Sequence, residues 1–233
     1  MPDNYFLDRL APGDRDALIG ILRPVSLRSG EVLIERDRVV DLVHFPVTAQ
    51  LANVTLTPDG EHLETAVIGK EGLSGLAPVM ARTPSSWQVN CTVGGSALVG
   101  AAEELRALAD RRPGVRHRLL VLTHFYQAQA NQLALCNILH RVPQRAARWL
   151  LTTSDLTGVS SFEMTQEQIA EALGVQRTSM VEAFGDLKKG RILRHTRSRF
   201  EILDRPALIR RACGCYAQLH DLACDLQILP RNR

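Results

Sequence analysis

Short apolar segments separated by turn residues characterise the first hundred residues. A helical pattern at about 12–22 is followed by β-rich segments at 25–28, 31–35, 42–45, 51–56 and 87–99. Glycine-containing turn signals lie at 29–30, 58–60, 69–75 and 94–95. Many short strands at close spacing predict an antiparallel β-roll or barrel.

From 113 to 139 the pattern changes to helical spacing. One seam with 3-4 spacing consists of Leu119, Leu122, Tyr126, Gln129, Leu133 and Cys136. A second apolar stripe beside it consists of Val121, Phe125, Ala128, Leu135 and Leu139. A long helix with two apolar faces needs two surfaces to pack against. We expect one face to pack on the β-roll and the seam to meet a twin helix in a second subunit. The alternative is a single broad stripe buried within one monomer.

A short helix at 143–151 and a polar loop at 154–161 lead into the most specific stretch of the chain. Thr165 precedes Gln168 by three residues, a capping box that predicts a helix start. Gly174 then supplies the backbone freedom of a tight turn. The inner faces of the two helices are expected to carry Ile169, Ala170 and Leu173, and then Met180, Val181, Phe184 and Leu187. This pattern predicts a helix-turn-helix whose second helix fits the DNA major groove.

The distribution of charge favours DNA binding over an ordinary helical hairpin with a solvated face. The chain has 28 Lys and Arg against 25 Asp and Glu, a net +3 that alone indicates no partner. Residues 1–140 carry −2 and residues 141–233 carry +5. Six basic residues fall between Lys188 and Arg199, where apolar and basic positions alternate. We interpret this segment as a two-stranded wing that contacts phosphates, with Arg194, His195, Arg197 and Arg199 at its tip.

The segment Thr165-Gln166-Glu167-Gln168-Ile169-Ala170, with Gly174, Arg177, Thr178 and Ser179, resembles the DNA-binding motif of the Crp–Fnr family of bacterial transcription regulators. The likeness covers about 15–205 and is strongest over 141–205. It implies an α+β fold in three parts. These are an N-terminal double-stranded β-helix (a jelly roll like a cyclic-nucleotide-binding domain) in 1–112, a long dimerisation helix in 113–140, and a winged helix-turn-helix in 141–233.

The resemblance also implies partners and site residues. A homodimer would bind a two-fold symmetric operator in double-stranded DNA, with RNA polymerase as a further partner if the chain is an activator. Arg177 would read a base, Thr165 and Ser179 would hold phosphates, and Gln166, Gln176 and Thr178 would lie at the interface. Lys188, Arg194, Arg197 and Arg199 complete the basic surface. Glu182 stands where cAMP-binding members carry a base-reading arginine or similar polar side chain. A carboxylate accepts from cytosine instead, so the operator should differ from theirs.

The β-roll lacks the residues with which family members hold cAMP. Gly75 is followed by Leu76 instead of Glu, and the counterpart of the Arg-Ser pair falls at Pro84-Ser85. Without that arginine the cyclic phosphate loses its main charge partner, so we expect that cAMP is not bound in the usual way. No cofactor is predicted, and the effector is unidentified. The candidate effector-pocket residues are Gly72, Gly75, Arg82, Ser85, Ser86, Gln127 and Asn131, of which Gln127 and Asn131 could instead pair across the dimer seam.

Five cysteines, an odd number, are typical of reduced thiols in a chain of this length. Cys213-x-Cys215 with the distant Cys224 is a weak metal or redox signal, because no matched second pair accompanies it. We interpret these residues as ordinary thiols of a C-terminal helix and predict no metal site. A haem ligand would have to come from His44, His117, His124 or His140, and each lies on an element that is otherwise explained.

Other function classes find less support. The chain has no P-loop, Gly-x-Ser-x-Gly or His-Glu-x-x-His motif, so no enzyme is expected. Its apolar runs are too short for a membrane span and its first residues do not resemble a signal peptide, so a cytoplasmic location is expected. A Crp-like dimer that binds DNA constitutively remains an alternative. A cyclic-nucleotide-binding accessory module is a second one, although it would leave the motif at 165–187 unexplained.

Overall fold

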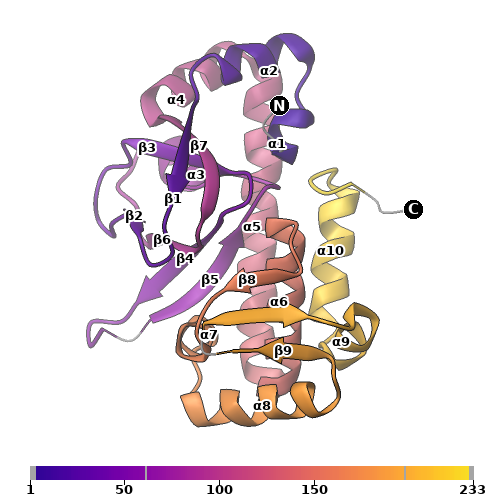
Figure 1. Ribbon diagram of the computed structural model, residues 1–233. Helices are drawn as coiled ribbons and strands as arrows, with labels where there is room; N and C mark the ends of the chain where they lie inside the picture. The colour runs from indigo at the N-terminus through magenta and orange to yellow at the C-terminus, as the bar shows by residue number, and fades with distance from the viewer. Residues whose placement is uncertain (1–3, 61, 197, 231–233) are drawn as a thin grey trace.

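The computed structural model describes residues 4–60, 62–196 and 198–230. A β-roll occupies one end of the molecule and a small helical unit with a three-stranded sheet occupies the other (Figure 1). The long helix α5 (Pro113–Leu139) runs between them, and α10 (Cys215–Asp225) lies beside it. Among the described residues, no helix has the length and apolar character that a membrane span requires.

The β-roll consists of two antiparallel sheets, as the pattern of short strands predicts. The first has the order β1-β7-β3, and the second has the order β2-β6-β4-β5. Their strands are β1 (Arg23–Leu27), β2 (Val32–Ile34), β3 (Leu42–Pro46), β4 (Gln50–Leu56), β5 (His62–Ile68), β6 (Gln88–Val93) and β7 (Gly95–Ala101). Four short helices accompany the roll: α1 (Tyr5–Asp8), α2 (Pro12–Ile19), α3 (Leu76–Ala81) and α4 (Ala102–Arg111). The predicted segment at 87–99 is therefore two strands, and β5 was not predicted.

Helix α5 has the predicted extent, but its partners differ from the prediction. Leu119, Leu122, Gln129, Leu133 and Cys136 of the expected dimer seam are buried within the protomer, and Tyr126 is half-buried. This face packs on the roll and on α10, and the Gln129 side chain accepts a hydrogen bond of 2.8 Å from the Val67 backbone N–H of β5. The prediction that this seam meets a second subunit is therefore wrong, because the chain itself covers it.

The opposite face of α5 is exposed. It carries Leu120, His124, Gln127, Asn131, Leu135 and Ile138, which follow one another at intervals of three or four residues. Leu120 is 53%, Leu135 45% and Ile138 83% exposed. Exposed apolar side chains in one stripe on a long helix mark a surface for a further partner. We call these six residues the α5 outer face.

The C-terminal unit packs around an aromatic core. It comprises α6 (Val142–Thr157), β8 (Ser161–Glu163), α7 (Gln166–Leu173), α8 (Arg177–Lys189), β9 (Leu193–His195), β10 (Arg199–Ile202) and α9 (Arg205–Arg211). Phe184 of α8 lies 4.9 Å from Phe200 of β10, ring centre to ring centre, and Phe162 of β8 stacks on Phe200. Helix α6 continues to Thr157, so the first half of the polar loop expected at 154–161 is helical.

A buried carboxyl joins the two ends of the molecule. Glu64 of β5 accepts a hydrogen bond of 3.1 Å from the indole N–H of Trp149 on α6. Burial raises the pKa of Glu64 to about 7, although the Trp149 hydrogen bond and the Arg148 charge act in the opposite direction. Burial therefore favours the protonated form of Glu64, whereas the hydrogen bond from Trp149 favours the carboxylate and only partly offsets the effect of burial.

Replacing Glu64 with glutamine is expected to stabilise the chain at alkaline pH. As the pH rises from 4.5 to about 7, the unfolded chain loses the Glu64 proton before the folded chain does, so the free energy of unfolding falls. Glu64→Gln removes this fall and is expected to gain up to about 3 kcal/mol above the higher pKa, with no gain in acid. Urea unfolding across this pH range measures the change in the free energy of unfolding, and the exposed Glu163→Gln serves as the control. A gain that does not vary with pH would contradict the assignment.

Candidate nucleic-acid interface and effector cavity

Local hydrogen bonds position the two helices of the helix-turn-helix as predicted. The Thr165 hydroxyl accepts from the Gln168 backbone N–H at 3.2 Å, and the Gln168 side chain accepts from the Thr165 N–H at 2.8 Å. Gly174 ends α7 in the left-handed region with φ of 59°, where a side chain would be strained. The Thr165 hydroxyl keeps its own proton, which remains available to donate to a phosphate oxygen.

The first turns of α8 present the predicted recognition residues to solvent. Gln176 caps the helix, and Arg177, Thr178 and Glu182 are exposed, while Ser179 is half-buried. Inward, Met180, Phe184 and Leu187 are buried as expected. Val181 is the exception: it is 50% exposed and Ala183 takes its place in the core. Val181 lies one turn after Arg177, so the outer surface of α8 has an apolar element that the sequence pattern did not reveal.

A hollow separates the start of the helix-turn-helix from the wing. Thr165, Gln166 and Arg177 line one side, and His195 and Thr196 line the other. The Gln166 side chain contacts the His195 ring at 2.6 Å between nitrogens, and that ring stacks on Phe200. Burial, with a smaller effect of Lys188, lowers the pKa of His195 below its ordinary value. His195 is thus a neutral part of the wing's packing at neutral pH, whereas the sequence analysis counted it among the basic groups of the tip.

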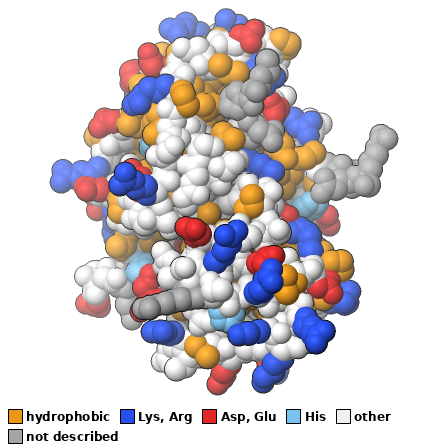
Figure 2. Space-filling view, in the orientation of Figure 1, with side chains coloured by type: hydrophobic (Ala, Val, Ile, Leu, Met, Phe, Trp, Pro, Cys, Tyr) orange, Lys and Arg blue, Asp and Glu red, His pale blue; other side chains and the backbone are white. Residues whose placement is uncertain are grey.

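The remaining basic groups of the wing differ in whether contacts within the chain already occupy them. Arg194 forms an ion pair with Glu201 across the β9–β10 strands, with a shortest distance of 2.6 Å. The Arg199 guanidinium donates to the Ser161 hydroxyl at 2.7 Å. Lys188 is exposed at the end of α8, and Arg197 lies outside the described residues. Several Lys and Arg side chains lie over the lower part of the molecule, where α8 and the wing are found (Figure 2).

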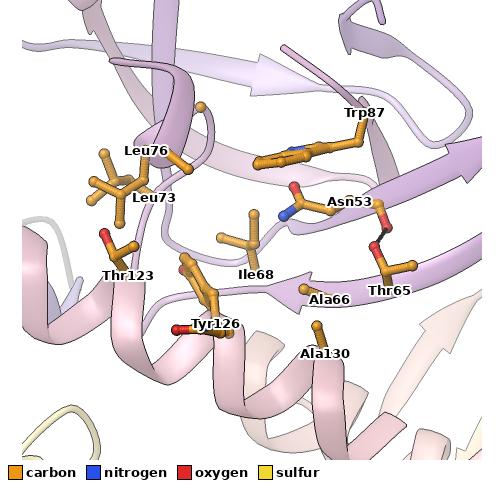
Figure 3. Close-up of a pocket in the computed structure, with 13 residues that line it drawn as sticks. Asn53, Thr65, Ala66, Ile68, Leu73, Leu76, Trp87, Thr123, Tyr126 and Ala130 are labelled. Carbon is orange, nitrogen blue, oxygen red and sulfur yellow. Dashed lines mark hydrogen bonds between the residues drawn. The ribbon is translucent and has the colours of Figure 1, made fainter. Parts of the chain in front are cut away.

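A cavity of about 240 Å³ lies between the roll and α5. Trp87 covers it on one side, and Tyr126 and Thr123 of α5 lie on the other, with Ile68 between them (Figure 3). Thr65 and Asn53 of the roll add polar groups, joined by a hydrogen bond of 3.2 Å from the Thr65 hydroxyl to the Asn53 carbonyl. Among the described residues that line the cavity, none is charged.

The cavity includes only part of the predicted effector pocket. Gly75 and Gln127 line it. The other five predicted residues do not line it. Arg82 pairs with Asp110 at 3.0 Å, and the Ser85 hydroxyl donates to the Trp87 carbonyl at 2.6 Å. Ser86 and Asn131 are exposed elsewhere, and Gly72 is buried against Tyr126. The exposed Arg82–Asp110 pair leaves the candidate effector pocket without its arginine. Tyr126 and Trp87, which face the cavity, were not predicted for it.

The C-terminal cysteines have different neighbours from those expected. Cys213 and Cys215 lie beside Cys136 and His140 at the end of α5, within 4.8 Å between side-chain donor atoms. Cys224 is directed instead to His220 and to the Pro230 carbonyl. Cys213 and Cys215 are free thiols beside and at the start of the C-terminal helix α10, as expected, but the sequence analysis did not place them with Cys136 and His140. The missed signal is a Cys136-x-x-x-His140 pair, whose side chains lie on one side of a helix end.

Comparison with known proteins supports the motif and the fold. Residues 144–211 match the family model of the Crp-like helix-turn-helix domain. A search of the curated proteins gives no match.

Among solved structures, FixK2 from Bradyrhizobium japonicum has a TM-score of 0.70 and 19% identity, over 83% of this chain and 98% of that one. A CRP-family regulator of Thermus thermophilus has a TM-score of 0.67 and 18% identity, over 81% and 96%. A putative Crp/Fnr regulator of Eubacterium rectale has a TM-score of 0.64 and 15% identity, over 87% and 95%. The helix-turn-helix thus matches the Crp-like domain, and the fold of the chain as a whole resembles that of these regulators.

Proposed function

We propose that this chain, which carries a Crp-like helix-turn-helix domain on the fold of Crp/Fnr regulators, is a transcription regulator that binds a two-fold symmetric operator as a homodimer. The observation that supports this proposal most directly is the division of α8 into two faces. Its inner face is buried around Phe184, while Arg177, Thr178 and Glu182 project from the first two turns into solvent. A helix presented in this way enters the major groove with its N-terminal residues on base edges.

Each exposed group of α8 has a chemical counterpart on DNA. Arg177 can donate two hydrogen bonds to the O6 and N7 atoms of a guanine. Val181 can contact a thymine methyl group, and the Glu182 carboxylate can accept from a cytosine amino group. Thr165 and Ser179 are placed at helix starts, where hydroxyl and backbone donors suit a phosphate. Gln176 and Thr178 lie beside Ser179 at the start of α8, Lys188 adds a positive charge at the far end of that helix, and Arg199 is a further basic group on the wing.

The α5 outer face is the surface we assign to the homodimer. It lies on the side of α5 away from the residues that pack on the roll and α10, and it is apolar at Leu120, Leu135 and Ile138. Two copies related by a two-fold axis would bury these side chains against each other and pair Gln127 or Asn131 across the axis. The two recognition helices would then read half-sites about one helical turn of DNA apart.

The cavity is the place for an effector. Its lining is mostly apolar and aromatic with a few hydroxyl and amide groups, which suits a small uncharged ligand better than the cyclic phosphate of cAMP. Gln127 lines the cavity and belongs to the α5 outer face, so a ligand there would touch the proposed dimer contact. Such a ligand would shift the population between dimers that do and do not fit successive grooves. A constitutive binder is the outcome if no ligand changes operator affinity. Operator binding implies a cytoplasmic protein, with RNA polymerase as partner if it activates.

Selection from a random DNA library tests the proposal. The full chain is expected to enrich a palindromic sequence, and anisotropy titrations should show that affinity for it falls steeply with salt and exceeds affinity for shuffled DNA by about 10³-fold or more. Equal affinity for palindromic and shuffled DNA would overturn the proposal. Repeating the titration with cAMP and with uncharged metabolites separates a ligand-controlled regulator from a constitutive one.

A further inference from the structure

Four side chains of types that can ligate a metal meet where α5, α6 and α10 come together. Cys136 lies in the last turn of α5 and His140 caps its C-terminus. Cys213 and Cys215 follow α9, and Cys215 is the first residue of α10. Cys136, Cys213 and Cys215 are buried and His140 is half-buried. Two segments that are far apart in the sequence, 136–140 and 213–215, therefore supply one cluster, which neither the DNA-binding surface nor the effector cavity uses.

The spacing of the donor atoms fits a tetrahedral metal ion. The Cys136 and Cys213 sulfur atoms are 3.5 Å apart, and the Cys215 sulfur is 3.5 Å from His140 Nδ1. All four donor atoms lie within 4.8 Å of one another. A tetrahedral zinc ion with Zn–S bonds of about 2.3 Å and a Zn–N bond of about 2.0 Å separates its ligand atoms by roughly 3.5–3.8 Å. The site therefore needs only small movements to close on an ion.

The surroundings suit an anionic metal–thiolate centre. Arg145 and Arg148 of α6 are buried, and both are close enough to Cys136 and Cys213 to interact with them electrostatically. Zinc with three thiolates and one neutral imidazole carries a single negative charge, which these guanidinium groups offset. The Gln132 amide donates to the Cys215 sulfur at 3.0 Å, as groups outside a metal's ligand set commonly do.

A disulfide bond would explain the positions of fewer of these four side chains than a metal ion would. All five cysteines have free thiols, and a bond between Cys136 and Cys213 would leave Cys215 and His140 without a role. Three cysteines and one histidine in a closed, buried site are instead a ligand set of structural zinc. Soft thiolate ligands disfavour magnesium, calcium and manganese.

We propose that Cys136, His140, Cys213 and Cys215 bind one zinc ion, which fastens the α9–α10 connection to the end of the long helix. His140 lies between α5 and α6, at the junction of the long helix and the DNA-binding unit. The ion would fix the angle of that junction and hold α10 along α5. Because zinc binds the folded chain and its ligands must be deprotonated, the ion would stabilise the fold and leave in acid.

Metal analysis of the full chain, purified under reducing conditions, tests this assignment. Inductively coupled plasma mass spectrometry is expected to find about one zinc ion per chain. Exchange for cobalt should give the intense visible bands of a tetrahedral ion and the charge-transfer absorption of thiolate ligands. Removing the zinc with a chelator should lower the melting temperature, and restoring zinc should recover it.

Variants at single cysteines locate the ion. Cys213→Ser is expected to lose zinc and the cobalt spectrum, whereas the control Cys224→Ser, which lies further along α10 and has other partners, keeps both. His140→Cys keeps a fourth ligand and should retain zinc while shifting the cobalt bands, which tests the site even if Cys213→Ser does not fold. The proposal fails if the wild-type chain takes up neither zinc nor cobalt, if zinc binding depends on Cys224, or if a metal-free chain contains a Cys136–Cys213 disulfide.

Discussion

Arg177→Ala is expected to reduce operator affinity by about 30-fold to 10⁴-fold. One bidentate contact to guanine contributes about 1–3 kcal/mol, and a two-fold complex contains the contact twice. Arg177 is exposed and lies at the start of α8, so its removal creates no cavity in the core and leaves the aromatic contacts around Phe184 in place. Anisotropy titration with the selected palindrome at fixed salt measures the loss, and circular dichroism confirms that the variant is folded.

Two matched variants separate base reading from charge. Arg177→Lys keeps the charge but not the planar pair of donors, so most of the loss should remain. Lys188→Ala removes an exposed charge at the far end of the same helix, so it should weaken selected and shuffled DNA alike and lower the salt dependence. If Arg177→Ala weakens both DNAs equally, Arg177 contacts phosphate and the assignment of base reading to it is wrong.

Sequence reasoning succeeded where the signals are local. The capping box at Thr165, the left-handed Gly174 and the buried stripe of α7 act within a few residues of one another, so the pattern determines the helix-turn-helix without knowledge of the rest of the fold. Pro113 likewise begins α5, because proline suits the first turn of a helix. Val181 is the residue of this motif that was predicted wrongly: the sequence pattern placed it on the inner face of α8, whereas the tertiary packing buries Ala183 instead.

Reasoning failed where the partner of a surface had to be chosen. The 3-4 seam from Leu119 to Cys136 is a genuine buried stripe, but periodicity cannot distinguish a second subunit from the chain's own β5 and α10. The cysteine cluster was not predicted for a related reason, because Cys136 and Cys213 are 77 residues apart and meet only when α10 returns along α5. The cavity depends on Trp87 and Tyr126, which come from opposite sides of the roll–helix contact.

These corrections change the route by which a ligand in the proposed effector cavity would affect the DNA-binding unit. The Glu64–Trp149 hydrogen bond, the Gln129–Val67 hydrogen bond and the cysteine cluster all lie along the junction of the roll, α5 and the DNA-binding unit. A ligand that moves α5 relative to the roll would disturb the Gln129–Val67 hydrogen bond directly, and it would reach the Glu64–Trp149 hydrogen bond through α6, which follows α5 in the chain. The orientation of α8 would then follow, because α6 carries Trp149 and packs against α8.

Ile138→Asp is expected to convert the dimer into monomers and to abolish tight operator binding. Ile138 is 83% exposed and lies on the α5 outer face, where a two-fold axis would bring two copies of the substitution close together. Burying two carboxylates in an apolar contact costs more than the contact contributes, so we expect dimer dissociation to rise by at least about 30-fold, as for a central interface residue. Sedimentation velocity measures the mass of the particle, and anisotropy titration with the same palindrome measures the operator affinity lost when the second half-site is no longer bound. Val39→Asp, which changes an equally simple apolar side chain that is 68% exposed on the roll, should leave both unchanged. A variant at Ile138 that stays dimeric would show that the chain associates through another surface, and the assignment of the α5 outer face would then be wrong.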